Sequence, residues 1–276
     1  MPSNPRFRLH CLLLVYTVLL AACAPAGRFV FQEHGEARPA RLQVFAAASL
    51  KDAFDALAPE FAAQNGGAQI VYNLGGSQQL TQQLAGGAPA DLFASANARQ
   101  MQAAVDAGRV APNASRIFAH NRLVVVYPAD NPAQIDDLAD LARPGLKLVL
   151  AAPQVPAGQY ALEFLDKAAA APGMPPDYRA AVLANAVSYE ENVRSVLNKV
   201  TLGEADAGIV YASDVAGDAT GRVGTLEIPA ALNVAAEYPV APVLDAEQPE
   251  LARRFVELLL SPQGRAVLEQ HGFSTP

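Results

Sequence analysis

Hydroxyl side chains stand at three places where an apolar strand gives way to another element. Ser49 follows the apolar run in VFAAASLKDAF (residues 44–54), Ser77 follows two glycines in IVYNLGGSQQLTQQL, and Tyr211 ends the run in GIVYASD. A hydroxyl is a neutral hydrogen-bond donor, and the free N–H groups at a helix start also point outward. These positions indicate a candidate anion site that is built from neutral donors.

Ser49 on its own has two interpretations. Leu50, Phe54 and Leu57 recur at helical spacing, so Ser49 falls at a helix start, where serine is a favoured N-cap. Asp52, three residues later, approximates a capping box and places a carboxylate near the positive end of the helix dipole. The alternative is that the same helix start binds an anion, and one serine does not decide between the two.

Two further helix starts add main-chain donors. VPAGQYA (residues 155–161) follows an apolar run, and Pro156 suits the first turn of the helix that comes next. In SYEENVRSVLNKV (residues 188–200) a helix starts near Glu190 to Asn192. Neither turn is followed by Gly-Lys-Ser or Gly-Lys-Thr, which excludes a phosphate-binding P-loop here. We expect unpaired N–H groups at both helix starts.

Three carboxylates lie close in sequence to these donors: Glu190, Glu191 and Asp214. A carboxylate in contact with a dianion would repel it. We therefore expect them to cap helices or to provide polar contacts at a hinge.

The N-terminal segment predicts export. Two arginines precede an apolar run over residues 12–22, which is too short to span a membrane comfortably and is typical of a signal peptide. The run ends in LAAC, which resembles the lipobox of bacterial lipoproteins and makes Cys23 the lipid attachment site. Residues 1–22 are then the signal peptide and residues 23–40 a lipid-anchored tether. An ordinary signal peptide, with Cys23 incidental, is the alternative.

Composition narrows the function classes. The chain has 276 residues, of which 51% are hydrophobic and 17% charged, enough to bury a large core. The formal net charge is −7 and Lys and Arg do not cluster, which disfavours nucleic acid as a partner. Because no cysteine follows Cys23, a disulfide, a zinc–thiolate site and a cysteine nucleophile are disfavoured. We expect no cofactor.

From residue 41 onward, short apolar runs alternate with amphipathic helical patterns. This alternation predicts an α/β fold with mainly parallel sheets. The predicted strands lie near residues 42–47, 69–73, 91–94, 122–127, 147–151, 207–211 and 237–243. In open α/β sheets ligands bind beyond the carboxyl ends of the strands, so these strand ends are where a site is expected.

Seven motifs occur in an order and at spacings that resemble the periplasmic molybdate-binding proteins of molybdate ABC transporters. They are VFAAASL, GGS, GGAPADLFASA, VPAGQYA, ENVR, GIVYASD and EYPVA, and the similarity covers residues 41–276. The resemblance implies a type II periplasmic binding protein, with two mainly parallel sheets flanked by helices and a ligand cleft between two lobes. With the predicted strands, it implies a first lobe of residues 41–122 plus 237–276 and a second lobe of residues 123–236.

The resemblance also implies a ligand and the residues that bind it. This family holds its oxyanion with serine and tyrosine hydroxyls and with backbone N–H groups. Carried over by position, Ser49, Ser77 and Tyr211 supply hydroxyls, and Ala157 and Val193 supply main-chain N–H groups. The expected ligand is molybdate, with tungstate bound about as well. A monomer in the periplasm or cell envelope would deliver it to an ABC permease in the membrane.

Other functions are the alternatives. Sulfate or phosphate is the alternative ligand, although neutral donors should select metal oxyanions by size and by their lack of a proton. Ferric sites use several tyrosines and carboxylates, whereas serines and N–H groups dominate these junctions. A serine-dependent enzyme needs a general base, and only His34, His120 and His271 follow the predicted signal peptide. No G-x-S-x-G motif is present, so we expect no catalysis.

Overall fold

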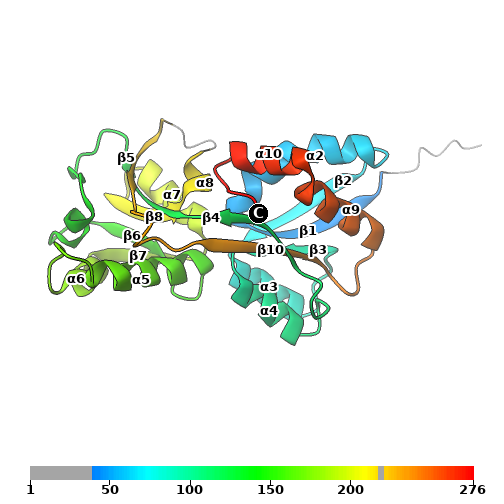
Figure 1. The fold of residues 1–276 in the computed structure, drawn as a ribbon, viewed down its shortest axis with the longest axis horizontal. Coiled ribbons are helices and arrows are strands. Elements are labelled where there is room, and N and C mark those ends of the chain that lie inside the picture. The colour runs from blue at the N-terminus through cyan, green and yellow to red at the C-terminus, as the bar shows by residue number, and fades with distance from the viewer. Residues whose placement is uncertain (1–38, 217–220) are drawn as a thin grey trace, which may run out of the picture. The chain divides into compact units, whose positions relative to one another are not determined.

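Two five-stranded sheets, each with helices on both faces, organise the residues that the computed structural model describes, 39–216 and 221–276 (Figure 1). Residues Pro39–Pro276 form one compact unit. The predicted signal peptide, Cys23 and all but the last two residues of the predicted tether lie outside the described residues. Within the described ranges, no helix is long and apolar enough to cross a membrane.

The first sheet has the strand order β2-β1-β3-β10-β4. Its strands are β1 (Arg41–Ala47), β2 (Gln69–Gly75), β3 (Leu92–Ala94), β4 (Arg116–Asn121) and β10 (Ala236–Pro242). One face carries α2 (Lys51–Gln64), α9 (Pro249–Leu260) and α10 (Pro262–Gln270), and the other carries α3 (Ser77–Ala85) and α4 (Ala98–Asp106) (Figure 1). Since helices cover both faces, β1 is buried from Val44 onward and reads as a continuous apolar run.

The second sheet has the strand order β7-β6-β8-β5-β9. Its strands are β5 (Leu123–Pro128), β6 (Leu148–Ala151), β7 (Ala186–Glu190), β8 (Ala207–Tyr211) and β9 (Val223–Glu227). Helices α5 (Pro156–Ala169) and α6 (Tyr178–Ala184) lie on one side, and α7 (Val193–Thr201) and α8 (Ala212–Val215) on the other (Figure 1). The described residues also form two 3-10 turns, η1 (Ala48–Leu50) after β1 and η2 (Leu138–Ala142) before β6.

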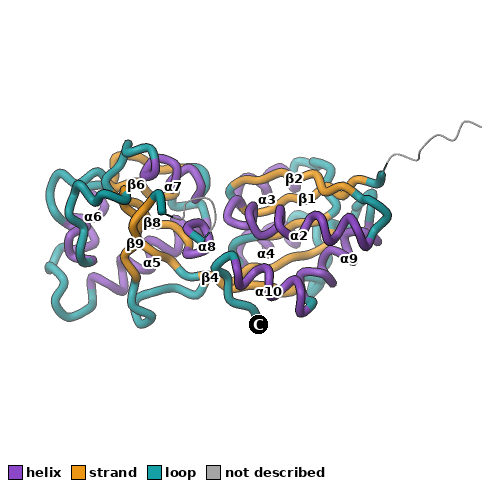
Figure 2. The backbone as a smooth tube through the Cα atoms, turned by 90° about the horizontal axis from the view of Figure 1, so that it is seen from above, coloured by secondary structure: helices purple, strands orange, loops and turns teal. Residues whose placement is uncertain are grey.

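The predicted α/β class with two mainly parallel sheets is confirmed, and each sheet contains one reversed strand. β1 runs parallel to β2 and β3, and β6 runs parallel to β7 and β8. By contrast, β10 is antiparallel to β3 and β4, and β5 is antiparallel to β8 and β9. The chain enters the second sheet through β5 and returns to the first through β10 (Figure 1). In Figure 2, β1 and β2 of the first sheet and β6 and β8 of the second lie in separate groups of elements. Each of β5 and β10 arrives from the carboxyl ends of its parallel neighbours, and this reverses its direction.

All seven predicted strands correspond to strands of the structure, and three more were not predicted. These are β4, β7 and β9, and each lies at an edge of its sheet. An edge strand is buried incompletely; in β7, Val187 and Tyr189 are 60% and 48% exposed. Such segments lack the continuous apolar run from which a buried strand is predicted.

Aromatic packing fixes the start of α2 at the end of β1. The ring of Phe54 in α2 lies 5.2 Å from the ring of Phe255 in α9, edge to face, and Phe61 meets the same ring at 5.3 Å. Each edge-to-face pair of this kind contributes about 0.5–1.5 kcal/mol beyond the burial of its two rings. The turn η1, which precedes α2, is therefore held in a defined position.

Candidate functional site

A small buried cavity lies where strand ends from both sheets meet the starts of η1, α3, α5 and α7. It offers about 10 Å³ to the centre of a water-sized sphere, far less than the roughly 300–1,000 Å³ of sites for drug-sized ligands. The residues that line it are Ala47, Ala48, Ser49, Gly75, Gly76, Ser77, Ala96, Val155, Pro156, Ala157, Asn192, Val193 and Tyr211. All five residues predicted to bind the ligand thus surround one cavity, and none of the five is more than 4% exposed. Their contact with a ligand stays a prediction.

Ser49 lies in η1, between β1 and α2, and does not cap the helix. Within the described part of the chain, neither η1 nor α2 has a side-chain hydrogen bond at its N-cap. Instead, Oγ of Ser49 lies 2.9 Å from the hydroxyl oxygen of Tyr238 in β10, and both side chains are buried. The interpretation of Ser49 as a cap is therefore wrong, and its role in anion binding stays a prediction.

Ser77 is the first residue of α3 and also has its oxygen occupied. Its Oγ accepts a hydrogen bond from the main-chain N–H of Ala96 at 3.0 Å. A serine hydroxyl has a single proton and two acceptor lone pairs. Since Ala96 already supplies a donor, the proton of Ser77 stays available for an acceptor.

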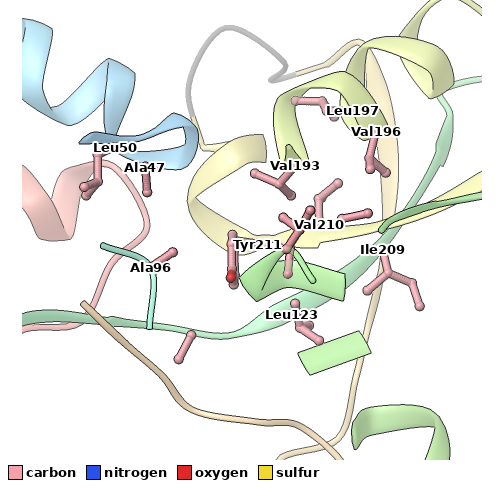
Figure 3. Close-up of a cluster of buried hydrophobic side chains, with 14 of the residues drawn as sticks. Ala47, Leu50, Ala96, Leu123, Val193, Val196, Leu197, Ile209, Val210 and Tyr211 are labelled. Carbon is pink, nitrogen blue, oxygen red and sulfur yellow. The ribbon is translucent and has the colours of Figure 1, made fainter. Parts of the chain in front are cut away.

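Tyr211 ends β8 with its phenol at the cavity wall. The hydroxyl is buried and has no hydrogen-bond partner among the described residues. Burial, and then the neighbouring Tyr238 and Tyr160, raise its pKa well above the ordinary value, so it keeps its proton at neutral pH. Figure 3 shows Tyr211 beside Val193, across from Ala47 and Ala96 on the other side of the cavity. A buried donor without a partner costs about 1–3 kcal/mol, which an acceptor on a ligand would offset.

Helices α5 and α7 begin at the cavity and bring main-chain donors. Pro156 and Ala157 are the first two residues of α5, and Val193 is the first residue of α7. The first N–H groups of a helix have no partner within the helix and carry the positive end of its dipole. A Cβ at Gly158 would lie 2.1 Å from the Ala152 carbonyl oxygen, so glycine allows α5 to start this close to β6.

The cavity wall combines hydroxyls and helix starts without a charged side chain among the described residues that line it. Such a wall matches a small anion that has acceptor atoms on every side. A protonated anion would bring an O–H group that needs an acceptor of its own. The arrangement therefore favours a fully deprotonated oxyanion.

Helix α3 of the first sheet contacts the segment before α7 of the second sheet. Gln78 Nε2 donates to the main-chain oxygen of Glu191 at 3.0 Å, and Gln79 Nε2 donates to the Glu191 carboxylate at 2.8 Å. A Cβ at Gly76 would lie 2.3 Å from the same main-chain oxygen. Glycine at position 76 therefore allows this close approach, and Glu191 makes polar contacts beside the cavity.

Arg194, the second residue of α7, links α2 to α8. Its guanidinium lies 2.7 Å from the Asp52 carboxylate in α2. Nε also lies 2.9 Å from Asp214 Oδ1, an ion pair without hydrogen-bond geometry. Asp214 is fully buried and accepts a hydrogen bond from the Tyr211 main-chain N–H at 3.1 Å. Burial raises the pKa of Asp214 to about 6, although Arg194 and the Tyr211 N–H act in the opposite direction.

Sequence analysis did not predict that Arg194, Tyr238 and Asn121 belong to this region. Arg194 lies in the first turn of a helix, where the helix dipole disfavours a cation unless carboxylates surround it. A cation at this position was the sequence signal for nearby carboxylates. Tyr238 carries a polar tip in an apolar strand, and a buried tyrosine hydroxyl usually finds a partner. Asn121, whose Nδ2 lies 2.7 Å from the Ser213 hydroxyl and 3.5 Å from the Tyr238 hydroxyl, ends a strand that was not predicted. We find no local signal for it.

Two sheets that surround a cavity at their strand ends define the class of two-lobed periplasmic binding proteins. The periplasmic molybdate-binding protein of Azotobacter vinelandii has this fold, with a TM-score of 0.73 over 85% of this chain and 99% of its own, at 22% identity. The sulfate-binding protein SubI of Mycobacterium tuberculosis gives 0.75 over 86% and 87%, at 23% identity. At such identities the likeness establishes the fold alone.

The chain belongs to the family of bacterial extracellular solute-binding proteins, whose family model matches residues 42–274. It is 40% identical over 233 residues to the molybdate-binding protein ModA of Mycobacterium tuberculosis, a match that covers 84% of each chain. The resemblance to molybdate-binding proteins, noted from seven motifs, is therefore confirmed at the level of the whole domain.

Proposed function

We propose that this protein is an extracytoplasmic solute-binding protein that captures molybdate, or tungstate, and delivers it to an ABC permease for import. The observation that supports this most is the buried cavity, in which three hydroxyls and the starts of α5 and α7 meet without a charged side chain among the described lining residues. The 40% identity to a molybdate-binding relative supports the choice of ligand.

Neutral donors favour molybdate over more common oxyanions. Molybdate and tungstate are tetrahedral dianions with four acceptor oxygens and no proton. A lysine or arginine would attract phosphate, sulfate and molybdate alike, whereas a closed cage of donors discriminates by size, because metal–oxygen bonds are longer than sulfur–oxygen bonds. A protonated phosphate would leave two donors facing each other in a buried cavity, which is costly.

Titration of the purified protein tests the proposed ligand. We expect molybdate and tungstate to bind with similar affinity and sulfate at least about 100-fold more weakly, a difference of about 2.7 kcal/mol. Isothermal titration calorimetry with molybdate, tungstate, sulfate and phosphate measures the four affinities. Sulfate or phosphate within tenfold of molybdate would show that the cavity does not select metal oxyanions.

We propose that the protein works as a monomer of two lobes, residues 41–122 plus 237–276 and residues 123–236. Ser49 and Ser77 would act from the first lobe, and the other three ligand residues from the second. Since all five are buried, the ligand must enter while the lobes are apart, and by bridging them it favours closure, as in other hinge-closing binding proteins.

We propose that the cavity binds its ligand without catalysis. His120 exchanges main-chain hydrogen bonds with Ser274, and Nδ1 of His271 lies 2.8 Å from the Val267 oxygen. Neither histidine lines the cavity, and His34 lies outside the described residues. A serine without a general base within reach is a weak nucleophile, and this supports a binding role.

We propose that Cys23 carries a lipid that anchors the protein in the cell envelope. The support comes from the LAAC motif and the breaker-rich segment that follows it. The Cys23→Ser variant should move from the membrane fraction to the soluble fraction, because a single lipid-bearing residue would be lost. Immunoblotting of separated fractions measures this. Unchanged membrane association, or no labelled fatty acid in the wild type, would argue for an ordinary signal peptide.

A further inference from the structure

The two serine hydroxyls of the cavity accept hydrogen bonds from donors of different kinds. Ser77 Oγ accepts from the main-chain N–H of Ala96, whose direction the backbone fixes. Ser49 Oγ lies 2.9 Å from the Tyr238 hydroxyl, and within this pair either oxygen could be the donor. The direction matters, because Ser49 offers its proton to a ligand only if Tyr238 donates to Ser49.

Asn121, the last residue of β4, favours one of these directions. Its Oδ1 accepts from the main-chain N–H of Arg122 at 2.9 Å, and a main-chain N–H can only donate, so the side-chain amide has one orientation. Nδ2 then faces the Ser213 hydroxyl at 2.7 Å and the Tyr238 hydroxyl at 3.5 Å. Since Nδ2 can only donate, it occupies the acceptor side of Tyr238. The tyrosine proton is left for Ser49.

We propose that Tyr238 is a positioning residue that makes Ser49 a donor toward the cavity, through a hydrogen-bond relay from Asn121 to Tyr238 to Ser49. The inference rests on the proposed function, since it assigns the proton of Ser49 to an oxygen of a bound oxyanion. Tyr238 itself does not line the cavity.

The surroundings of the relay keep its direction constant. Tyr238 is 0% exposed, Ser49 2% and Asn121 5%, so water does not compete for their hydrogen bonds. Burial also raises the pKa of the Tyr238 hydroxyl, which therefore keeps the proton that it donates. If Ser49 donated to Tyr238 instead, its lone pairs would face the anion and repel it. The relay thus favours ligands that accept hydrogen bonds and donate none.

A double-mutant cycle tests whether Tyr238 acts through Ser49. Tyr238→Phe should weaken molybdate binding by about three- to tenfold, the scale of one lost hydrogen bond. In a Ser49→Ala background the same change should have less than about a twofold effect, because no hydroxyl is left to orient. Isothermal titration calorimetry measures the affinities, and thermal unfolding confirms that each variant is folded.

Tyr178→Phe is the matched control. Tyr178 is also fully buried, and its hydroxyl donates to the Leu138 main-chain oxygen at 2.8 Å, away from the cavity. This variant should lower the melting temperature and leave the affinity unchanged. In Tyr238→Phe, by contrast, the ratio of molybdate affinity to phosphate affinity should fall, because Ser49 can then accept a proton from hydrogen phosphate. A merely structural role of Tyr238 would not move this ratio.

The outcomes distinguish the relay from the proposed ligand. The relay would be overturned if Tyr238→Phe caused equal losses of affinity in the wild-type and Ser49→Ala backgrounds, or no loss in either. If the wild type prefers sulfate, molybdate is the wrong ligand, and the same cycle measured with sulfate still decides the role of Tyr238. If the wild type binds none of molybdate, tungstate and sulfate, both proposals are wrong.

Discussion

Replacing Arg194 with methionine is expected to lower the free energy of unfolding by about 3–5 kcal/mol at pH 7.5. Methionine keeps most of the aliphatic volume but removes the cation that the Asp52 and Asp214 carboxylates share. Asp214 is fully buried, so its charge would be left without its ion-pair partner. The contact between α7 and α2 would also be lost, and we expect faster release of the ligand. Urea unfolding of the ligand-free protein measures the loss of stability.

The loss of stability in Arg194→Met should depend on pH in a defined direction. Burial raises the pKa of Asp214 to about 6 in the folded state, above the roughly 3.9 of an unfolded chain. The folded state therefore binds this proton more tightly, and the stability that Asp214 contributes at low pH is lost as the pH rises through about 6. The difference between Arg194→Met and wild type should accordingly shrink from pH 7.5 to pH 5, where Asp214 becomes neutral.

Two further variants isolate the buried charge. Adding Asp214→Asn to Arg194→Met should restore part of the stability at pH 7.5, because the amide carries no charge. Arg254→Met is the control, since Arg254 forms an exposed ion pair with Glu250 within α9 and should change stability little. If Arg194→Met behaved like Arg254→Met, the buried ion pair would have no role in stability.

The position of the cavity could be predicted because its side-chain donors follow recognisable strand ends. Ser77 lies two residues beyond the end of β2 and Tyr211 is the last residue of β8, and parallel strands bring their carboxyl ends to one edge of a sheet. Ala157 and Val193 carry no such signal. Their proposed donors are main-chain N–H groups, which every residue except proline has, so only the resemblance to a known family singled them out.

The contacts around the cavity could not be predicted, because they join distant parts of the chain. Arg194 and Asp52 are separated by 142 positions, and Asn121 and Tyr238 by 117. Local periodicity says which face of an element is buried but not which buried polar groups meet. The reversed strand of each sheet could not be predicted for a related reason: the direction of β10 depends on its return from the second sheet, and no local pattern records this.

Val193→Pro is expected to weaken molybdate binding by at least about 150-fold, or ~3 kcal/mol, in a protein that stays folded. Proline is tolerated at the first position of a helix, where α7 has Val193. Asn192 has φ −156° and ψ 164°, the extended backbone that a residue before proline adopts. The substitution removes the main-chain N–H and would place a ring carbon against an oxygen of the proposed anion. Calorimetric titration with molybdate measures the loss, and thermal unfolding reports on the fold.

Two comparison variants separate a main-chain donor from a side-chain donor. Val193→Ala keeps the N–H, so affinity should change by less than about threefold. It should lower the stability of the fold, because the smaller side chain loses packing contacts. Tyr211→Phe removes a side-chain donor and should weaken binding by about 1.5–3 kcal/mol. It should not lower the melting temperature, because the hydroxyl has no partner among the described residues. If Val193→Pro binds like wild type, or Val193→Ala loses binding while folded, the N–H of Val193 is not a ligand donor.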